Sequence, residues 1–284
     1  MTAGDQPRIE LDPAEVWRAA AEGWVRNADL VDRLSRPARE WIVANIGPKP
    51  GDTVLELAAG AGDTGFDTAE RIGPEGRLIS SDIAPVMLEA GRERAARRGL
   101  ANVEFREIDA QAIGLEDGSV DAVVHRFGPM LLPEPDASFR EVRRVLRPGG
   151  RYACAVWGAP EANPWIPMTG MPLVQIGLQP PGDPFVPGGL FSLADPEALE
   201  RRVRDAGFAD VRVEAVPQTF SFTDFDELWR IPSEVAGPIA VIVSQLDEER
   251  RSAFRDGFRS LADTYRTGSG GYRVPSEALC VLAS

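Results

Sequence analysis

Short apolar runs alternate with segments of helical pattern between residues 53 and 158, and this alternation limits the fold more than any other feature of the chain. The runs are TVLELA, RLISSD, NVEFREID, SVDAVVHRF and RYACAVWG, and turn or polar residues follow most of them. Strands that are separated by helices form a parallel sheet with helices on both faces. The sequence therefore predicts an α/β fold.

The segments between and after these runs complete the expected architecture. Helical patterns cover residues 64–72, 85–98, 135–146 and 195–206, and a short helix-like stretch follows residue 109. The runs VRVEAV and ALCVLAS supply two more strands near the end of the chain. We expect a Rossmann-like, doubly wound, mostly parallel sheet of seven strands with a helical and loop cap.

Four segments are expected along the chain. N-terminal helices in 1–48 are predicted to cover the site, 49–158 to form a cofactor-binding core, and 159–194, rich in Pro and Gly, to form a lid loop. The end of the sheet follows in 195–284. A helical cap insertion is expected at about 222–266, where DEERRSAFRDGFRSLADTY is amphipathic.

Composition excludes several classes of function. A formal net charge of −13 would repel nucleic acid, and no basic stripe compensates for it. Two cysteines in apolar runs, Cys154 and Cys280, support neither a disulfide framework nor a metal site. The first residues lack the pattern of a leader peptide and no apolar stretch is long enough to span a membrane, so a cytoplasmic location is expected. Nothing in the sequence indicates an oligomeric state.

A glycine-rich turn follows the first run, in the segment ELAAGAGDTG. Glycines allow a backbone to approach a ligand closely, and the next helix offers free N–H groups. Gly60, Gly62 and Gly65 also match the spacing of a dinucleotide fingerprint, so a nicotinamide-dependent oxidoreductase stays open as an alternative.

Acidic residues end the next two runs. Asp82 is expected to accept hydrogen bonds from ribose hydroxyls, Ile83 to pack on adenine, and Asp109 with Ala110 and Gln111 to hold the adenine edge. Two structural alternatives exist. Asp82 would cap the following helix, although Pro85 at the first helical position places that cap at Ala84, and Asp109 would only stabilise a turn.

At this point the chain resembles the class I S-adenosylmethionine-dependent methyltransferases, in particular the ubiquinone and menaquinone biosynthesis branch. The segments that carry the resemblance are VLELAAGAGDTG, SSDIAPVMLEAGRERA, VEFREIDAQAIGLEDGSVDAVVHRFGPMLL and REVRRVLRPGGRYACAVWG. It covers roughly residues 50–160, and FSLADPEALERRVRDAGFADVRVEAV matches more loosely.

The resemblance implies a cofactor and residues that hold it. Glu56 and the turn from Ala58 to Gly62 would contact the methionine part of S-adenosylmethionine, Asp82 the ribose, and Asp109–Gln111 the adenine. Ala58 departs from the family pattern, which has glycine there, and we expect this change to be tolerated. The implied reaction is in-line methyl transfer to a small, partly apolar molecule, with S-adenosylhomocysteine as product.

The acceptor side is indicated less sharply. His125, the only histidine, is a candidate general base or a structural residue, and Arg126 would neutralise a carboxylate or brace its loop. Phe127, Trp24, Trp157 and Trp165 are candidate wall residues, and each tryptophan is also a candidate for the core.

Other activities are weighed against this one. A non-catalytic cofactor-binding regulator stays open beside the nicotinamide oxidoreductase. Radical chemistry would need three cysteines for an iron–sulfur cluster, and the chain has two. No ligand spacing supports a magnesium site.

Overall fold

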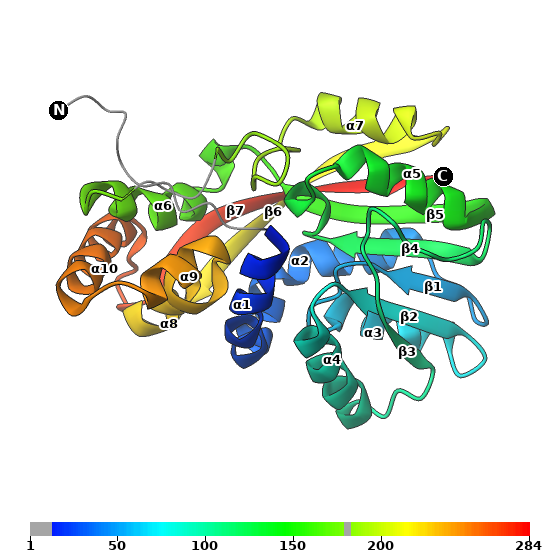
Figure 1. Ribbon diagram of the computed structural model, residues 1–284, viewed down its shortest axis with the longest axis horizontal. Coiled ribbons are helices and arrows are strands. Elements are labelled where there is room, and N and C mark those ends of the chain that lie inside the picture. Colours follow the sequence, from blue (N-terminus) through cyan, green and yellow to red (C-terminus); the bar gives the residue numbers. More distant parts are fainter. Residues whose placement is uncertain (1–12, 179–182) are drawn as a thin grey trace. The chain divides into compact units, whose positions relative to one another are not determined.

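The computed structural model describes residues 13–178 and 183–284, and its central feature is a seven-stranded sheet in the order β3-β2-β1-β4-β5-β7-β6 (Figure 1). Strands β1 to β5 pair in parallel, whereas β7 runs antiparallel to β5. The predicted mostly parallel sheet of seven strands is confirmed. The strands are β1 Thr53–Glu56, β2 Arg77–Asp82, β3 Val103–Glu107, β4 Val120–Arg126, β5 Leu146–Trp157, β6 Val211–Phe222 and β7 Tyr272–Ala283.

The α-helices agree with most of the predicted helical segments. They are α1 Pro13–Arg26, α2 Ala28–Ile46, α3 Asp63–Ile72, α4 Pro85–Arg97, α5 Pro135–Val145, α6 Trp165–Gln175, α7 Pro196–Asp205, α8 Phe225–Arg230, α9 Pro238–Ser244 and α10 Glu248–Ala262. The first four segments expected in the sheet region correspond to α3, α4, α5 and α7. Helices α8, α9 and α10 fall within the predicted cap insertion.

Two predictions of local structure are wrong. The stretch after residue 109 contains turns and an isolated bridge between Asp109 and Ala112, with no helix before β4. The region expected to be a lid loop contains α6, because its apolar residues, Ile166 and Leu173 among them, are buried along one helix. Pro172 lies inside this helix and hid it from the sequence pattern.

The chain divides into two compact units. The sheet unit contains residues 35–159, 184–217 and 277–284, and the helical unit contains the described residues within 13–34, 160–183 and 218–276. Both β6 and β7 have residues in each unit. The four segments expected along the chain, with boundaries at 48, 158 and 194, stay a prediction.

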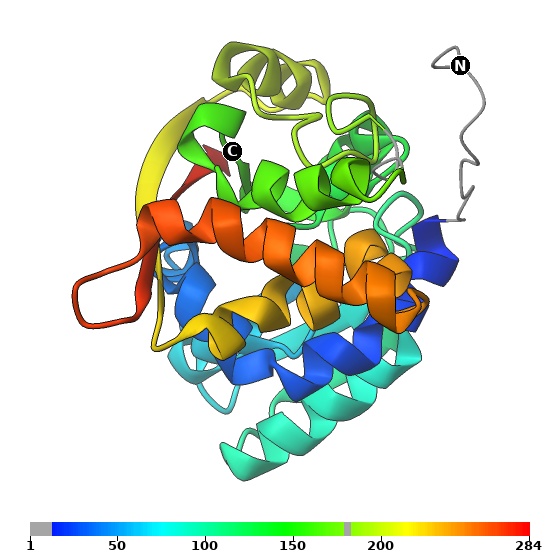
Figure 2. The same cartoon turned by 90° about the vertical axis from the view of Figure 1, so that its left-hand side faces the viewer.

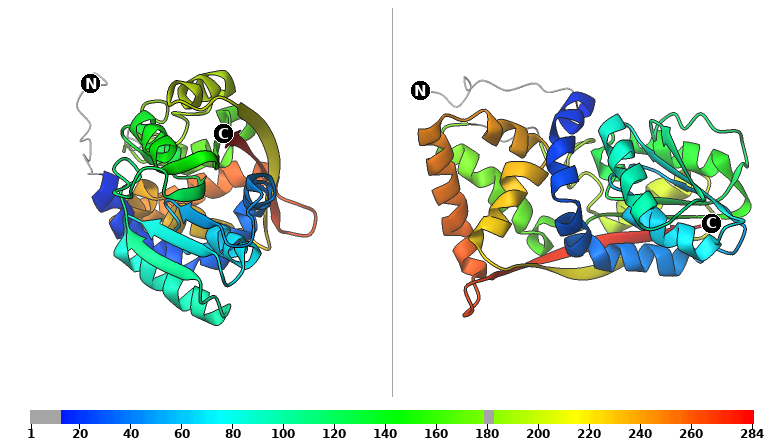
Figure 3. Two further views of the ribbon diagram at one scale, coloured as in Figure 1. Left: turned by 90° about the vertical axis from the view of Figure 1, so that its right-hand side faces the viewer. Right: turned by 90° about the horizontal axis from the view of Figure 1, so that it is seen from below.

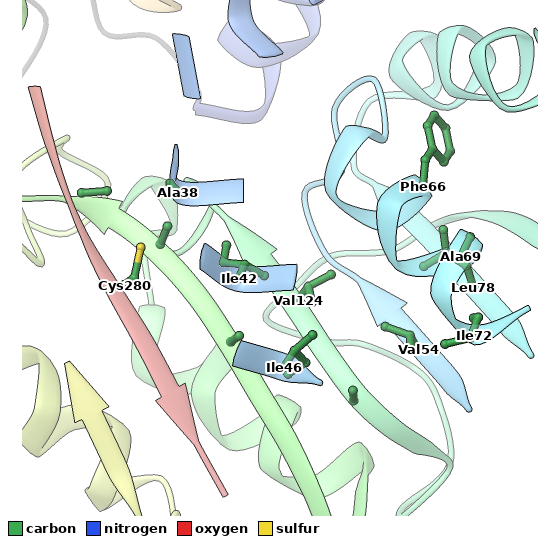
Figure 4. Close-up of a cluster of buried hydrophobic side chains, with 14 of the residues drawn as sticks. Ala38, Ile42, Ile46, Val54, Phe66, Ala69, Ile72, Leu78, Val124 and Cys280 are labelled. Carbon is green, nitrogen blue, oxygen red and sulfur yellow. The ribbon is translucent and has the colours of Figure 1, made fainter. Parts of the chain in front are cut away.

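The sheet unit has a core on each face of its sheet. On one face, Ile42 of α2 and Phe66 of α3 pack with strand residues such as Val124 (Figure 4). On the other face, Tyr152 of β5 lies 6.2 Å from the ring of Phe139 and 5.8 Å from that of Phe208. Helices α5 and α7 lie on that side, opposite α3 and α4 (Figures 1 and 3). Because helices cover both faces, the ends of the strands are left to hold ligands.

The helical unit is built around apolar and aromatic side chains. Helix α10 lies beside α6, as Figure 2 shows in orange and green. Leu173, Val243 and Phe254 form a buried cluster, against which Trp229 packs. This interior contrasts with the polar strand ends of the sheet unit.

Candidate functional site

The predicted site residues of the sheet unit gather at one edge of the sheet. Strands β1, β2, β4 and β5 end at Glu56, Asp82, Arg126 and Trp157, and Asp109 follows the end of β3 by two residues. Because these five strands are parallel, their carboxyl ends share an edge. Open α/β sheets bind ligands at such an edge, so this is the candidate functional site.

Glu56 lies beneath this edge and is 2% exposed. Its carboxylate accepts a hydrogen bond from the backbone N–H of Gly65 at 2.7 Å and another from the Ser80 hydroxyl at 3.0 Å. Burial raises the pKa of Glu56 from 4.5 to about 7, even though these two bonds and the charge of Arg126 lower it. The carboxylate therefore fixes the start of α3 and changes its charge near neutral pH.

The turn from Ala58 to Gly62 brings backbone to the surface of the edge. Ala58, Gly60 and Gly62 all have positive φ, at 48°, 55° and 91°. A side chain on Gly60 would meet no atom within 4 Å, whereas one on Gly62 would overlap the Phe66 ring. Ala58 therefore adopts a conformation that favours glycine, and the backbone at Gly60 is open for close approach by a ligand.

Asp82 holds this turn in place. Its two carboxylate oxygens accept hydrogen bonds from the backbone N–H groups of Gly60 and Ala84, each at 2.9 Å. Helix α4 begins with Ala84 as its N-cap and without a side-chain cap, so Asp82 stands outside the helix, as predicted. Burial raises its pKa, and the two N–H groups counteract part of that rise. A carboxylate has further lone pairs for hydroxyl groups.

The segment after β3 forms a tight turn. The Asp109 carboxylate accepts a hydrogen bond from the backbone N–H of Gln111 at 2.8 Å, and the Gln111 side-chain oxygen accepts one from the backbone N–H of Glu134. Ala110 is buried and Ile83 is half-buried. The structure thus gives Asp109 the turn-forming contact that the structural alternative predicts, and Gln111 ties the turn to the start of α5.

His125 lies inside the sheet unit, on the α5 side of β4. The imidazole is fully buried, its Nδ1 lies 3.5 Å from the Tyr152 hydroxyl, and its Nε2 has no hydrogen-bond partner among the described residues. Burial lowers the pKa of His125 to about 3. The ring is therefore neutral and enclosed, which agrees with the structural interpretation of this residue.

Arg126 points across the edge toward two helices. Its guanidinium donates to the Thr64 hydroxyl of α3 at 2.8 Å and to the Ser35 hydroxyl of α2. It also lowers the pKa of the nearby Glu56. These contacts brace the unit. The carboxylate whose charge Arg126 offsets is that of Glu56, a residue of the protein itself.

The aromatic candidates fall in different units. Phe127 and Trp157 of the sheet unit stack with ring centroids 3.8 Å apart and planes inclined by 16°. In the helical unit, the Trp24 indole donates to the Val235 carbonyl at 2.6 Å, and Trp165 packs on Phe220. Only the first pair is therefore placed at the carboxyl edge.

Several contributing residues were not predicted from the sequence. Ser80 and Ser81 are buried at the end of β2, and both donate hydrogen bonds to Glu56, through its carboxylate and its backbone carbonyl. The hydroxyl groups of Thr64 and Ser35 accept hydrogen bonds from Arg126. Two adjacent serines in a run that is otherwise a buried strand were the available signal, because buried hydroxyl groups need partners.

Metal ligands, cysteines and membrane-spanning helices also bear on what the described chain can do. No group of three His, Cys, Asp or Glu residues in the described chain is arranged to hold a metal ion. Cys154 and Cys280 are buried, and burial raises the pKa of the Cys154 thiol to about 12. Among the described helices, none combines the length and the apolar character needed to cross a membrane.

Comparisons with known proteins place the chain in a family. Residues 30–165 match the model of the ubiE/COQ5 methyltransferase family. A ubiquinone/menaquinone biosynthesis C-methyltransferase from Bradyrhizobium diazoefficiens is 34% identical over 227 residues, which cover 73% of this chain and 86% of that relative. The enzyme of that name from Xanthomonas campestris is 39% identical over 132 residues, so the match spans 44% of this chain and about half, 52%, of the relative.

A solved structure has the same fold. The structure of a putative methyltransferase from Bacillus halodurans superposes with a TM-score of 0.57 at 17% identity, over 86% of this chain and 97% of that one. At this identity the likeness concerns the fold alone, and family membership rests on the sequence matches. By its similarity to the Bradyrhizobium protein over most of both lengths, the chain belongs to the ubiE/COQ5 methyltransferase family.

Proposed function

We propose that the protein is an S-adenosylmethionine-dependent methyltransferase that acts on a small, partly apolar molecule. The observation that carries the proposal is the pairing of Asp82 with the glycine turn. Its carboxylate, held by Gly60 and Ala84, stands beside the open backbone of Gly60. Such a pair suits a ligand with ribose hydroxyls.

The other residues of the edge fit the rest of this cofactor. The turn from Ala58 to Gly62 would lie against the methionine part, with the charge of Glu56 beneath it. The cofactor ammonium would favour ionised Glu56, whose pKa of about 7 lets it change charge near neutral pH. Ile83 and the turn from Asp109 to Gln111 would hold the adenine.

The protein has little chemistry of its own to perform. The cofactor supplies an already activated sulfonium methyl group, so the residues need to orient the partners and exclude water. The stacked rings of Phe127 and Trp157 would limit water at the carboxyl edge. His125 receives no proton-transfer role in this proposal, because its ring is fully buried. Its structural interpretation is the one that its surroundings support.

The acceptor is proposed more coarsely than the cofactor. The two relatives described above are named as C-methyltransferases of ubiquinone and menaquinone biosynthesis. We propose a small molecule with an apolar part for this chain too, with Trp24 and Trp165 as wall residues. A net charge of −13 disfavours nucleic acid, and a cytoplasmic location belongs to the same proposal.

Binding titrations test the cofactor. S-adenosylhomocysteine and NAD should be titrated separately into the full chain by calorimetry. We expect saturable binding of S-adenosylhomocysteine and none of NAD at the same concentrations. The reverse order of affinities would favour a nicotinamide oxidoreductase. Cofactor binding without transfer of labelled methyl to any member of a panel of phenols, quinols and amines would favour a non-catalytic regulator.

A matched pair of variants tests the carrying observation. Asp82→Asn replaces one acceptor oxygen by a donor and should weaken S-adenosylhomocysteine binding by about 10-fold to 100-fold, since a hydrogen bond to a charged group contributes roughly 1.5–3 kcal/mol. Asp117→Asn, at an exposed acid paired with Arg144, should leave the affinity unchanged. Equal affinities of the two variants would remove Asp82 from the cofactor site.

A further inference from the structure

Two residues of the described chain adopt a left-handed backbone without being glycine. They are Ala58, with φ of 48°, and Phe127, with φ of 55°. Ala58 follows β1 and Phe127 follows β4, and these two strands are paired neighbours. Strained backbone of this kind persists only where the surroundings fix it, and it concentrates at functional sites. Both residues lie at the carboxyl edge.

A buried imidazole and a glycine lie between these two residues. A side chain on Gly128 would place its Cβ 2.1 Å from His125 Nε2 and 2.8 Å from the Ala58 methyl carbon. Gly128 itself has an ordinary φ of −95°, so glycine is required there for space and not for conformation. The imidazole and the Ala58 methyl group therefore border the same small volume beside the Gly128 backbone.

We propose that His125 is a positioning residue that holds the two strained turns together, so that the cofactor turn and the Phe127–Trp157 pair move as one body. This inference rests on the proposed function, because it takes the turn at Ala58 to be the cofactor turn. Through Gly128, the imidazole supports the turn that contains Phe127, whose ring stacks on Trp157. A ligand that contacts Ala58 would thereby affect the position of the Phe127–Trp157 pair.

The surroundings of the ring suit this role better than proton transfer. Tyr152 is the polar side chain that faces Nδ1, and no described group pairs with Nε2. A protonated ring would leave a charge buried without a partner. A neutral ring supplies a flat, rigid body beside the Gly128 backbone.

The single histidine makes a direct test practical. In untagged, 15N-labelled protein, a long-range proton–nitrogen correlation spectrum shows one imidazole, that of His125. We expect the signals of a neutral ring in one tautomer that do not titrate between pH 8 and pH 5. Saturation with S-adenosylhomocysteine should shift them. Titration near pH 6.5, or signals unchanged by a ligand that calorimetry shows to be bound, would overturn the inference.

Ala58→Gly separates positioning from a merely structural contact. The change removes the methyl group that borders, with the imidazole, the space beside Gly128, and it also relieves the left-handed strain. We expect a melting temperature equal to or above that of the wild type, together with S-adenosylhomocysteine binding weakened about 3-fold to 10-fold and a smaller ligand-induced shift of the His125 signals. Ala101→Gly, in an exposed loop, is the matched control. Unchanged affinity with an unchanged His125 response would contradict the inference.

A second substitution approaches the same point from Gly128. Gly128→Ala inserts a methyl group where the imidazole lies and should weaken S-adenosylhomocysteine binding at least 10-fold. Gly268→Ala, where a side chain meets no atom within 4 Å, should leave it unchanged. If Gly128→Ala does not fold, the wild-type spectra and Ala58→Gly still decide. If the wild type does not bind S-adenosylhomocysteine at all, the proposed function fails, which is a different outcome from binding without a His125 response.

Discussion

The sheet unit and the helical unit bury polar side chains in different ways. In the sheet unit, Ser80 donates a hydrogen bond to Glu56 and Arg126 donates to Thr64 and Ser35. The charge of Arg126 acts on Glu56 and so links the two groups at the ends of β1, β2 and β4. In the helical unit, Ser276 donates a hydrogen bond to Asn163, and Asn27 donates one to Glu234, which also accepts from Arg26. The polar groups of the sheet unit thus gather at strand ends, where open α/β sheets bind ligands, whereas those of the helical unit connect segments that are far apart in the chain.

The interior of the helical unit is aromatic and apolar, unlike the polar strand ends of the sheet unit. In the helical unit, ring pairs with centroids 5.8 to 6.4 Å apart are formed among Phe225, Trp229, Phe254, Phe258 and Tyr272. Packing of this kind tolerates many apolar sequences. A few polar positions therefore define the candidate site of the sheet unit, while volume and apolar character define the helical unit.

Substitution in the aromatic interior of the helical unit should change stability strongly and cofactor affinity little. Phe254→Ala removes a fully buried ring that packs against Trp229 and should lower the free energy of unfolding by about 3–5 kcal/mol in denaturant titrations. Because the cofactor candidates lie in the sheet unit, S-adenosylhomocysteine affinity at low temperature should change less than 2-fold. Val174→Ala, at an exposed position of α6, is the control. A 10-fold loss of cofactor affinity would show that the cofactor side depends on the helical interior.

The same contrast explains what the sequence could predict. Glu56, Asp82, Arg126 and Trp157 are the last residues of their strands, so the alternation of apolar runs located them at one edge. The meeting of Ala58, His125 and Gly128 depends on β1 lying beside β4, an adjacency that no local pattern contains. Helix α6 was missed for a local reason, since prolines suggested a loop while burial of its apolar side chains stabilises a helix.

The second prediction concerns the pH dependence that Glu56 gives to the sheet unit. Its pKa in the folded chain is about 7 against an ordinary 4.5, so between these values the folded state binds more protons than the unfolded state. Its contribution to stability is present below pH 4.5 and falls by about 3 kcal/mol as the pH rises to 7. Glu56→Gln keeps an acceptor for Gly65 and should remove this dependence in denaturant titrations at several pH values. A Glu56→Gln curve parallel to that of the wild type would refute the shift.

His125 contributes with the opposite sign. Its pKa is about 3 in the folded chain against an ordinary 6.5, so the unfolded state binds the extra proton in this interval. Its contribution is therefore complete above pH 6.5 and falls by about 1.4 kcal/mol for each pH unit below it. Between pH 4.5 and 6.5 the two groups oppose each other. Because the two slopes are of similar size, these groups should leave the stability of the wild type nearly constant there, whereas His125→Gln should lose stability as the pH rises and Glu56→Gln should gain it.

Gln218 tests whether a buried polar group of the helical unit serves a ligand. The Gln218 side chain is buried, and neither its oxygen nor its nitrogen has a hydrogen-bond partner among the described residues. Leaving such a group unpaired costs more than replacing it by an apolar one of similar size. Gln218→Leu should therefore raise the free energy of unfolding by about 1 kcal/mol.

The control and the contrary outcome define what Gln218 does. Gln175→Leu, at an exposed position of α6, should change the free energy of unfolding by less than about 0.5 kcal/mol. If Gln218→Leu stabilises the chain and methyl transfer to an identified acceptor is unchanged, the amide is a cost of packing alone. If the stability rises but transfer falls 10-fold or more, Gln218 acts on the acceptor. The helical unit would then contain a polar position that serves a ligand, and the two units would differ only in how many such positions they have.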